Sequence, residues 1–169
     1  MTDRQRNTLL NAVKFGGVFV TSGTLERANV MCTHWGAIGR MWNRDVFILP
    51  VRRRKLSNEL IQKNMSFVLN VPLTDMSTQL NRCDSLPGDG IDKIAELGLT
   101  LSPSKLVKAP GIAECGMHFE CKVIYTMEMG AGKLDSVIAR DMYIGREFHT
   151  IFIGEIVKSS MPKISAKKK

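Results

Sequence analysis

The sequence lacks the features that mark membrane proteins and the common nucleotide folds. It has no hydrophobic run long enough to cross a bilayer and no long apolar segment of the signal-peptide kind near its N-terminus. Neither a GxGxxG motif after a strand nor a P-loop motif occurs, and there is no internal repeat. Helical and strand patterns do not alternate, which argues against a parallel doubly wound sheet. We expect a cytoplasmic protein with no membrane partner.

Cysteine is scarce and forms no metal-binding pattern. The four cysteines are Cys32, Cys83, Cys115 and Cys121, and none belongs to a CxxC pair. Cys115 and Cys121 are six positions apart, which fits no common zinc site. We therefore predict reduced thiols and no metal site. Cys115 and Cys121 are interpreted as core residues.

Acidic residues are few relative to basic ones, and the formal net charge is +8. Nucleic acid, a membrane surface or a phosphorylated ligand would each attract such a chain. The last three residues are lysines, and a basic end of this kind is usually solvated. The rest of the excess is concentrated in Arg52, Arg53, Arg54 and Lys55. Nucleic acid is a poor fit, because no row of aromatic residues is interleaved with the basic ones.

Apolar runs and alternation predict strands, bounded by turn residues, over 16–22, 28–33, 46–49, 65–71, 118–126 and 148–157. Residues 1–12 are expected to be a polar lead-in with a candidate helical turn at Leu9 and Leu10. Residues 84–90 are predicted to form a loop, and residues 99–116 and 127–141 show little pattern.

Three short helices are predicted between these strands. The first follows Ser57, which we expect to be its N-cap. The second follows Thr74 or Asp75, and the third follows Asp89 and ends at Gly98. The pattern predicts one domain over residues 1–169, with a core at about 16–157 and a basic tail at 158–169. The fold class is mainly β with short helices, as in a small antiparallel barrel.

The most patterned segment is residues 28–54. A strand leads into a glycine-broken loop that holds Trp35 and Trp42, and a second apolar strand then delivers the arginines. Aromatic side chains followed by compact positive charge suit a flat ring that carries a phosphate.

At this point the chain resembles a known family, the flavin reductase-like, FMN-binding split-barrel proteins, particularly the flavoredoxin-like branch. The resemblance runs from about residue 16 to residue 157. The matching pieces, in the family's order, are residues 29–31, Trp35 with Gly36, Val51 with Arg52, Lys55, Ser57 and Glu59, residues 67–72, Cys83, Asp92 with Lys93, residues 96–100, residues 120–123, His149 and residues 154–157.

The resemblance implies a split β-barrel of Greek-key type that works as a homodimer with FMN near the subunit interface. It implies NAD(P)H as a hydride donor and His149 as a catalytic residue that approaches the ring. The implied FMN contacts are Asn29, Val30, Met31, Cys32, Trp35, Val51, Arg52, Lys55, Ser57, Cys83, Ser85 and Lys93.

The chain departs from the family pattern at several of these positions. The family commonly has threonine at Cys32, arginine at Lys55 and threonine at Ser57. The loop after Cys83 carries Asp84 and Asp89, where the family has a glycine and a positive side chain. These carboxylates weaken the expectation of nicotinamide binding more than that of flavin binding.

Three functions therefore stay open. The first is an enzyme that passes hydride from NAD(P)H through FMN to an acceptor. The second is an FMN electron carrier without a nicotinamide site, and the third is a degenerate barrel that binds a partner through its basic surface. The individual residues also have plain structural interpretations: Trp35 in a core or dimer interface, His149 as a satisfied core histidine, Cys83 as packing, and the arginines as a solvated edge.

Overall fold

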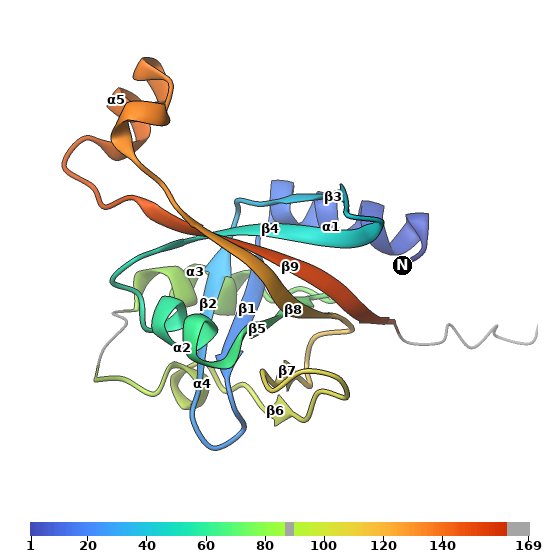
Figure 1. The fold of residues 1–169 in the computed structure, drawn as a ribbon. Helices are drawn as coiled ribbons and strands as arrows, with labels where there is room; N and C mark the ends of the chain where they lie inside the picture. Colours follow the sequence, from blue (N-terminus) through green and yellow to red (C-terminus); the bar gives the residue numbers. More distant parts are fainter. Residues whose placement is uncertain (87–89, 162–169) are drawn as a thin grey trace, which may run out of the picture.

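The computed structural model describes residues 1–86 and 90–161, and strands dominate it (Figure 1). The strands are β1 (Val18–Gly23), β2 (Ala28–Thr33), β3 (Ala37–Met41), β4 (Arg44–Arg52), β5 (Ser66–Val71), β6 (Leu101–Ser102), β7 (Gly111–Ile112), β8 (Met117–Glu128) and β9 (His149–Ser160). The helices are α1 (Asp3–Phe15), α2 (Leu56–Asn64), α3 (Ser77–Ser85), α4 (Lys93–Glu96), the 3₁₀ turn η1 (Ala131–Lys133) and α5 (Ser136–Tyr143).

Seven strands form one antiparallel sheet in the order β2-β1-β5-β8-β9-β4-β3, and β6 pairs with β7 separately. The edge strands β2 and β3 are consecutive in the chain, with only residues 34–36 between them. A flat sheet of seven strands would hold its edges about 29 Å apart. The link between Thr33 and Ala37 spans at most about 14 Å. The sheet must therefore curl, and because β2 and β3 are not paired, it forms a split barrel.

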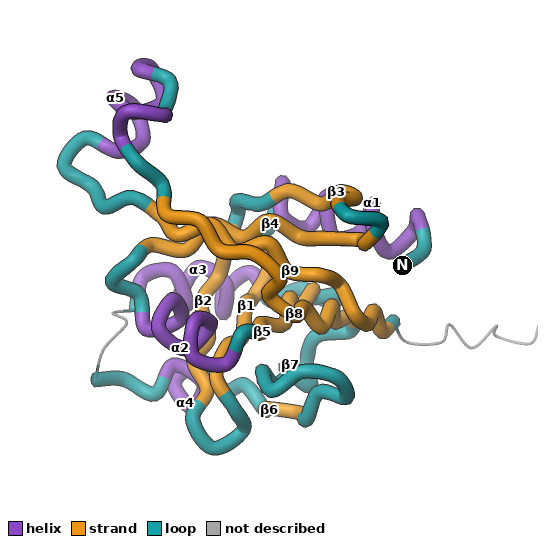
Figure 2. The backbone as a smooth tube through the Cα atoms, in the orientation of Figure 1, coloured by secondary structure: helices purple, strands orange, loops and turns teal. Residues whose placement is uncertain are grey.

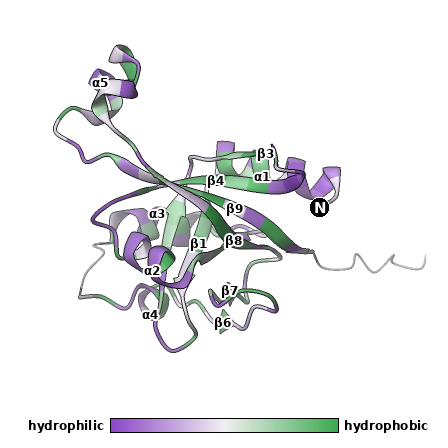
Figure 3. Cartoon of the chain, viewed as in Figure 1, coloured by the Kyte–Doolittle hydropathy of each residue, from purple (hydrophilic) through white to green (hydrophobic). Residues whose placement is uncertain are grey.

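The main core lies inside this curled sheet. Its largest fully buried side chains are phenylalanines and aliphatic residues from β1, β4, β5, β8 and β9, together with Leu9 of α1 and Ile61 of α2. Hydrophobic colour accordingly follows the strands in Figure 3, whereas α2 and the outer turns of α1 are more hydrophilic. A second cluster, which includes Phe19, Val30 and Cys83, lies where α3 and α4 cover β2. The mainly β fold class with short helices is confirmed.

Helix α1 corrects the prediction of a polar lead-in. Thr2 caps the helix, and its side chain and that of Gln5 form a reciprocal capping box. Leu9 and Val13 are buried in the main core, and the Gln5 Oε1 accepts a hydrogen bond from the Ser159 hydroxyl on β9 at 3.1 Å. The core therefore extends beyond the predicted limits of 16–157.

Strand β3 was missed, and β4 is longer than its predicted range of 46–49. The two form a hairpin with a two-residue turn, in which Trp42 and Asn43 have φ of 50° and 59°. Both residues take the left-handed conformation of a type I′ turn. Neither residue is a glycine, so the sequence gives little indication of this turn. Strand β4 continues through Pro50 because β3 pairs only as far as Ile48, so the proline lies on an unpaired side.

The helix boundaries differ from the predictions in three places. Lys55, not Ser57, is the N-cap of α2, and Ser57 is buried within its first turn. Helix α3 has Met76, not Thr74 or Asp75, as its N-cap, and it extends through Ser85, so the first part of the predicted 84–90 loop is helical. Asp92 caps α4 and accepts hydrogen bonds from two backbone N–H groups, whereas the expected cap Asp89 lies outside the described residues.

Helix α5 was also missed, because residues 127–141 carry little hydrophobic pattern. It lies on a long excursion between β8 and β9 that projects from the barrel (Figures 1 and 2). Asp135 caps it by accepting from the N–H groups of Val137 and Ile138. Strand β9 in turn runs to Ser160, so residues 158–160 are strand and not tail; residues 162–169 lie outside the described ranges. Within those ranges no helix combines the length and the hydropathy needed to span a bilayer.

Candidate functional site

Two adjoining cavities lie where β2, β4 and β9 meet the N-terminus of α2 and the end of α3. Their volumes are about 180 Å³ and about 370 Å³. They share Met31, Arg52, Lys55 and Asp84 as lining residues, so together they form one elongated site. We call the first the ring end and the second the charged end.

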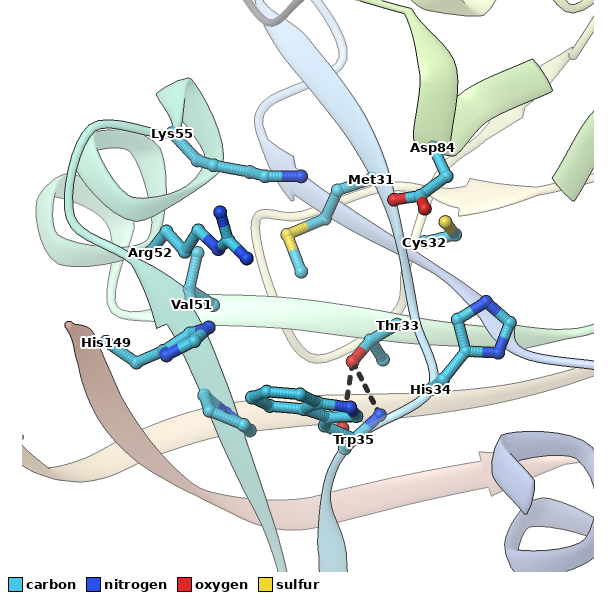
Figure 4. Close-up of a pocket in the computed structure, with 11 residues that line it drawn as sticks. Met31, Cys32, Thr33, His34, Trp35, Val51, Arg52, Lys55, Asp84 and His149 are labelled. Atoms are coloured by element: carbon cyan, nitrogen blue, oxygen red, sulfur yellow. Dashed lines mark hydrogen bonds between the residues drawn. The ribbon is translucent and has the colours of Figure 1, made fainter. Parts of the chain in front are cut away.

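The ring end has an aromatic wall, shown in Figure 4. It is lined by Met31, Cys32, Thr33, His34, Trp35, Pro50, Val51, Arg52, Lys55, Asp84 and His149. The rings of Trp35 and His149 lie 5.3 Å apart between centroids, tilted by 43°. Trp35 is 38% exposed whereas His149 is buried, so the indole offers surface to a ligand and the imidazole supports it.

The position of Trp35 is set by the residue at the end of β2. The Thr33 hydroxyl accepts a hydrogen bond from the Trp35 N–H at 3.1 Å and donates one to the Trp35 carbonyl at 2.8 Å (Figure 4). This is a local side-chain turn of the kind that threonine forms outside regular structure. It fixes the backbone of Trp35 as the chain leaves β2 for β3.

His149 is held by Tyr143 from the α5 excursion. The Tyr143 hydroxyl and the His149 Nδ1 lie 2.9 Å apart, and the two rings are nearly perpendicular. Burial lowers the pKa of His149 below 6.5, and the positive charges of Arg52 and Lys55 lower it further, against a smaller opposite effect of Glu147. His149 is therefore neutral at pH 7 and acts as a hydrogen-bonding group and not as a cation.

The charged end begins at the N-terminus of α2. Lys55 is the N-cap and provides no side-chain acceptor, so the first turn of α2 has no side-chain cap. Arg52 and Lys55 form no ion pair within residues 1–86 and 90–161. An uncapped helix N-terminus beside two free cations is a suitable place for a phosphate group.

The neighbouring arginines have carboxylate partners. Arg53 Nε lies 2.5 Å from Glu128 Oε2, and its Nη2 donates to the Met129 carbonyl at 2.8 Å. Arg54 Nε lies 3.6 Å from Glu147 Oε1 and is highly exposed. The Arg53 side chain is therefore bound at the start of the excursion between β8 and β9. Arg54, in contrast, lines the charged end.

Two carboxylates lie among the cations of the charged end. Its lining includes Arg52, Arg54, Lys55 and Lys93 together with Asp84 and Glu147. Four cations against two carboxylates leave the lining positive. Lys93 is 5% exposed, and its ammonium group donates to the carbonyl of Cys83 at 3.3 Å, which fixes it beneath the site.

The structure brings together nine of the thirteen predicted site residues. Asn29, Met31, Cys32, Trp35, Val51, Arg52, Lys55, Lys93 and His149 line one or both cavities. Four do not. Val30 on β2 and Cys83 on α3 are buried in the second cluster, and Ser57 is buried in α2, where its Oγ accepts from the Asn29 side chain at 2.9 Å. The Ser85 hydroxyl donates to the Arg82 carbonyl at the end of α3.

Sequence reasoning missed several residues of the site. His34, Pro50, Leu86, Arg54 and Glu147 line it. Tyr143 acts on the site through its hydrogen bond with His149. It comes from a segment whose sequence predicts neither a strand nor a helix. Asp84 was noted as a departure from the family pattern, and the structure makes it a lining residue of both cavities. Of the missed lining residues, Arg54 belongs to the basic run at residues 52–55, and the others carry no periodic signal in the sequence.

The residues present fit a flat ring that bears a phosphate. The ring end offers the exposed face of an indole, the apolar side chains of Met31 and Val51, and a neutral imidazole. The charged end offers Arg52, Lys55 and an uncapped helix terminus. A ligand of this shape would lie along the elongated site with its anion against α2.

Comparisons with known proteins identify the family of this chain. A family model described as a flavin reductase like domain matches residues 10–168. A protein of Archaeoglobus fulgidus is 28% identical over 138 residues, which cover 82% of this chain and 67% of that protein.

Two solved structures share the fold. The flavoredoxin of Desulfovibrio vulgaris (Miyazaki F) matches with a TM-score of 0.69 and 24% identity, over 87% of this chain and 69% of that one. The flavoredoxin of Methanosarcina acetivorans matches with a TM-score of 0.70 and 22% identity, over 88% and 69%. With the family model matching nearly the whole length, this chain belongs to the flavin reductase like domain family.

Proposed function

We propose that the chain binds FMN in the elongated site and uses it for oxidation and reduction. The observation that carries this proposal is the pairing of an aromatic wall with Arg52 and Lys55 at the uncapped N-terminus of α2. Family membership and the similarity to proteins named flavoredoxin support the same ligand. A bound flavin supplies the hydride and electron transfer chemistry.

Different residues of this chain would contact different parts of the FMN. Arg52 and Lys55 neutralise a phosphate of about two negative charges at pH 7, and the first backbone N–H groups of α2 add donors. Trp35 packs against the ring. His149, held neutral and oriented by Tyr143, offers its second ring nitrogen for a hydrogen bond.

The four predicted contacts that do not line the site would act indirectly. The Ser57 hydroxyl orients Asn29, whose amide lines the charged end. Val30 and Cys83 pack in the same buried cluster as Cys32 and support β2 there, and Ser85 closes the end of α3 beside Asp84.

Family membership supports a first candidate, an FMN-dependent oxidoreductase that accepts hydride from NAD(P)H. The second candidate is an FMN electron carrier without a nicotinamide site. The carboxylates of Asp84 and Glu147 favour the second candidate, because they would repel the diphosphate of a dinucleotide near the charged end.

The experiment begins with the absorption spectrum of the purified protein and its equilibrium binding of added FMN. Retained FMN supports both candidates, whereas failure to retain it contradicts both. NADH and NADPH are then added without oxygen. Bleaching of the bound flavin identifies the enzyme, and its absence identifies the carrier.

We also infer that two copies of the chain associate. Apolar side chains are exposed on the outer face of β8, on the β3–β4 turn and on the α5 excursion, and a second copy would cover them. They are Trp42, Tyr125, Met127, Val137, Ile138 and Ile144. Sedimentation of the purified protein tests this, with a monomer at micromolar concentration as the contradicting result.

A further inference from the structure

Two of the four cysteines face each other behind the ring end. Cys32 lies on β2 and borders the cavity, and Cys83 lies near the end of α3. Their thiols are close enough to shift each other's pKa. Cys83 Sγ also lies 4.0 Å from the carbonyl oxygen of Val30, two residues before Cys32 on the same strand. Both side chains belong to the same buried cluster, so the packing of α3 on β2 holds the pair.

The charges around the pair distinguish its two members. The thiol of Cys32 and the positive charges of Lys93 and Lys55 lower the pKa of Cys83, against the opposite effects of burial and of Asp84. The pKa of Cys32 is raised, first by its interaction with Cys83 and then by burial. Cys83 is therefore the more acidic thiol of the pair, and Cys32 holds its proton more tightly. Asp84, whose carboxylate lies beside Cys32 in Figure 4, also raises the pKa of Cys32.

The other two cysteines provide an internal contrast. Burial raises the pKa of Cys115 to about 12 and raises that of Cys121 strongly. Neither lines a described cavity near the site, and neither interacts with another thiol in residues 1–86 and 90–161. A buried cysteine with no thiol neighbour is inert, whereas the more acidic member of a thiol pair is the one that attacks in disulfide chemistry.

We propose that Cys32 and Cys83 form a redox-active dithiol that closes to a disulfide between β2 and α3 and passes its electrons to an oxidised flavin in the ring end. The flavin as oxidant rests on the proposed function. The S–S bond forms as both thiols lose their protons, and the two electrons and two protons pass to the flavin, which becomes dihydroflavin. The reverse reaction opens the disulfide. The chain would then accept electrons from thiols as well as from a nicotinamide.

The first test uses the full chain without flavin. Diamide, an azo oxidant of thiols, is added to the folded protein, and the product is analysed by intact mass and peptide mapping. We expect loss of two hydrogens and one cross-linked peptide pair that contains Cys32 and Cys83. Four free thiols after treatment, or a cross-link through Cys115 or Cys121, would overturn the dithiol.

The second test uses the reduced protein with FMN, without oxygen or nicotinamide. We expect bleaching of the bound flavin with loss of two thiols per flavin. Cys32→Ser and Cys83→Ser should each abolish bleaching, and Cys115→Ser, the matched control, should retain it. Circular dichroism confirms that each variant is folded, and Cys83→Ala replaces Cys83→Ser if the latter unfolds.

The two proposals fail in different ways. Bound FMN that stays oxidised beside two free thiols contradicts the dithiol as an electron donor and leaves the proposed function standing. FMN that is not retained contradicts the proposed function, and the diamide cross-link on the protein without flavin then decides whether the dithiol exists.

Discussion

The two ends of the elongated site are built by different physical means. The ring end is positioned by short-range contacts: the Thr33 hydroxyl fixes Trp35, and the Tyr143 hydroxyl fixes His149. The charged end depends on Arg52 and Lys55, which have no carboxylate partner in the described residues, next to a helix terminus without a side-chain cap. The ring end selects a ligand by shape and the charged end selects it by charge. Substitutions at the two ends should therefore have different effects on stability and on FMN binding.

The largest effect is expected from Arg52→Ala, which removes a cation from the charged end. A hydrogen bond to a charged group contributes about 1.5–3 kcal/mol, so FMN affinity should fall by about 10- to 100-fold. Equilibrium titration with FMN measures it. Arg53→Ala is the matched control, because Arg53 is paired with Glu128. Equal losses in the two variants would show that the phosphate does not lie against α2.

Gly36→Ala, next to Trp35 of the ring end, should lower the free energy of unfolding. A Cβ at Gly36, where φ is +155°, would lie 2.3 Å from the Phe47 ring, and this residue links the two edges of the split barrel. Overpacking of this kind costs about 1–3 kcal/mol of the free energy of unfolding.

Denaturant unfolding measures the loss at Gly36. Gly39→Ala is the control, since nothing lies within 4 Å of a Cβ added there. A Gly36→Ala variant as stable as the Gly39→Ala variant would contradict the close approach of the link to β4.

Asp84 offers a change in the opposite direction. Asp84→Asn keeps the shape of the side chain and removes a carboxylate that faces the cations of the charged end. FMN binding should tighten by a few-fold, corresponding to about 1 kcal/mol for one partly screened charge pair. The gain should shrink as salt is added. Weaker FMN binding in this variant would indicate that Asp84 contacts the ligand directly.

The smallest effect concerns the titration of His149, which couples the two ends. Its pKa is below 6.5 in the folded chain, so the unfolded chain takes up the proton more readily. Stability should therefore be fully present above about pH 6.5 and decline as the pH falls through that value toward the folded pKa. Arg52→Ala should raise the pKa of His149, because Arg52 faces it across β4 and β9.

NMR titration of the imidazole protons measures this shift. An unchanged His149 pKa in Arg52→Ala would show that the charge of Arg52 does not contribute to it. The unfolding free energy, compared at about pH 7.5 and pH 5.5, provides the second measurement. Greater stability at the lower pH would contradict the assigned direction.

The sequence predicted the strands whose apolar residues alternate or cluster, and it predicted the charged end from the run that begins at Arg52. It missed α1 and β3, since a capping box and a weakly apolar hairpin carry little periodic signal. It placed the N-cap of α2 two residues late, because serine is the common capping type and lysine is not. The assignment of all 169 residues to one domain stays a prediction.

Local sequence thus determined which segments are strands, which residues are cations and which aromatic side chains are near the turn after β2, because those properties depend on neighbours in the chain. Only the tertiary structure decided which of them meet. The Tyr143 hydroxyl lies within hydrogen-bond distance of His149, and Cys83 lies next to Cys32. Glu128 forms an ion pair with Arg53 and not with Arg52. These pairings depend on how the sheet curls and where α3 and the α5 excursion pack, which are set by long-range burial and not by residues adjacent in sequence.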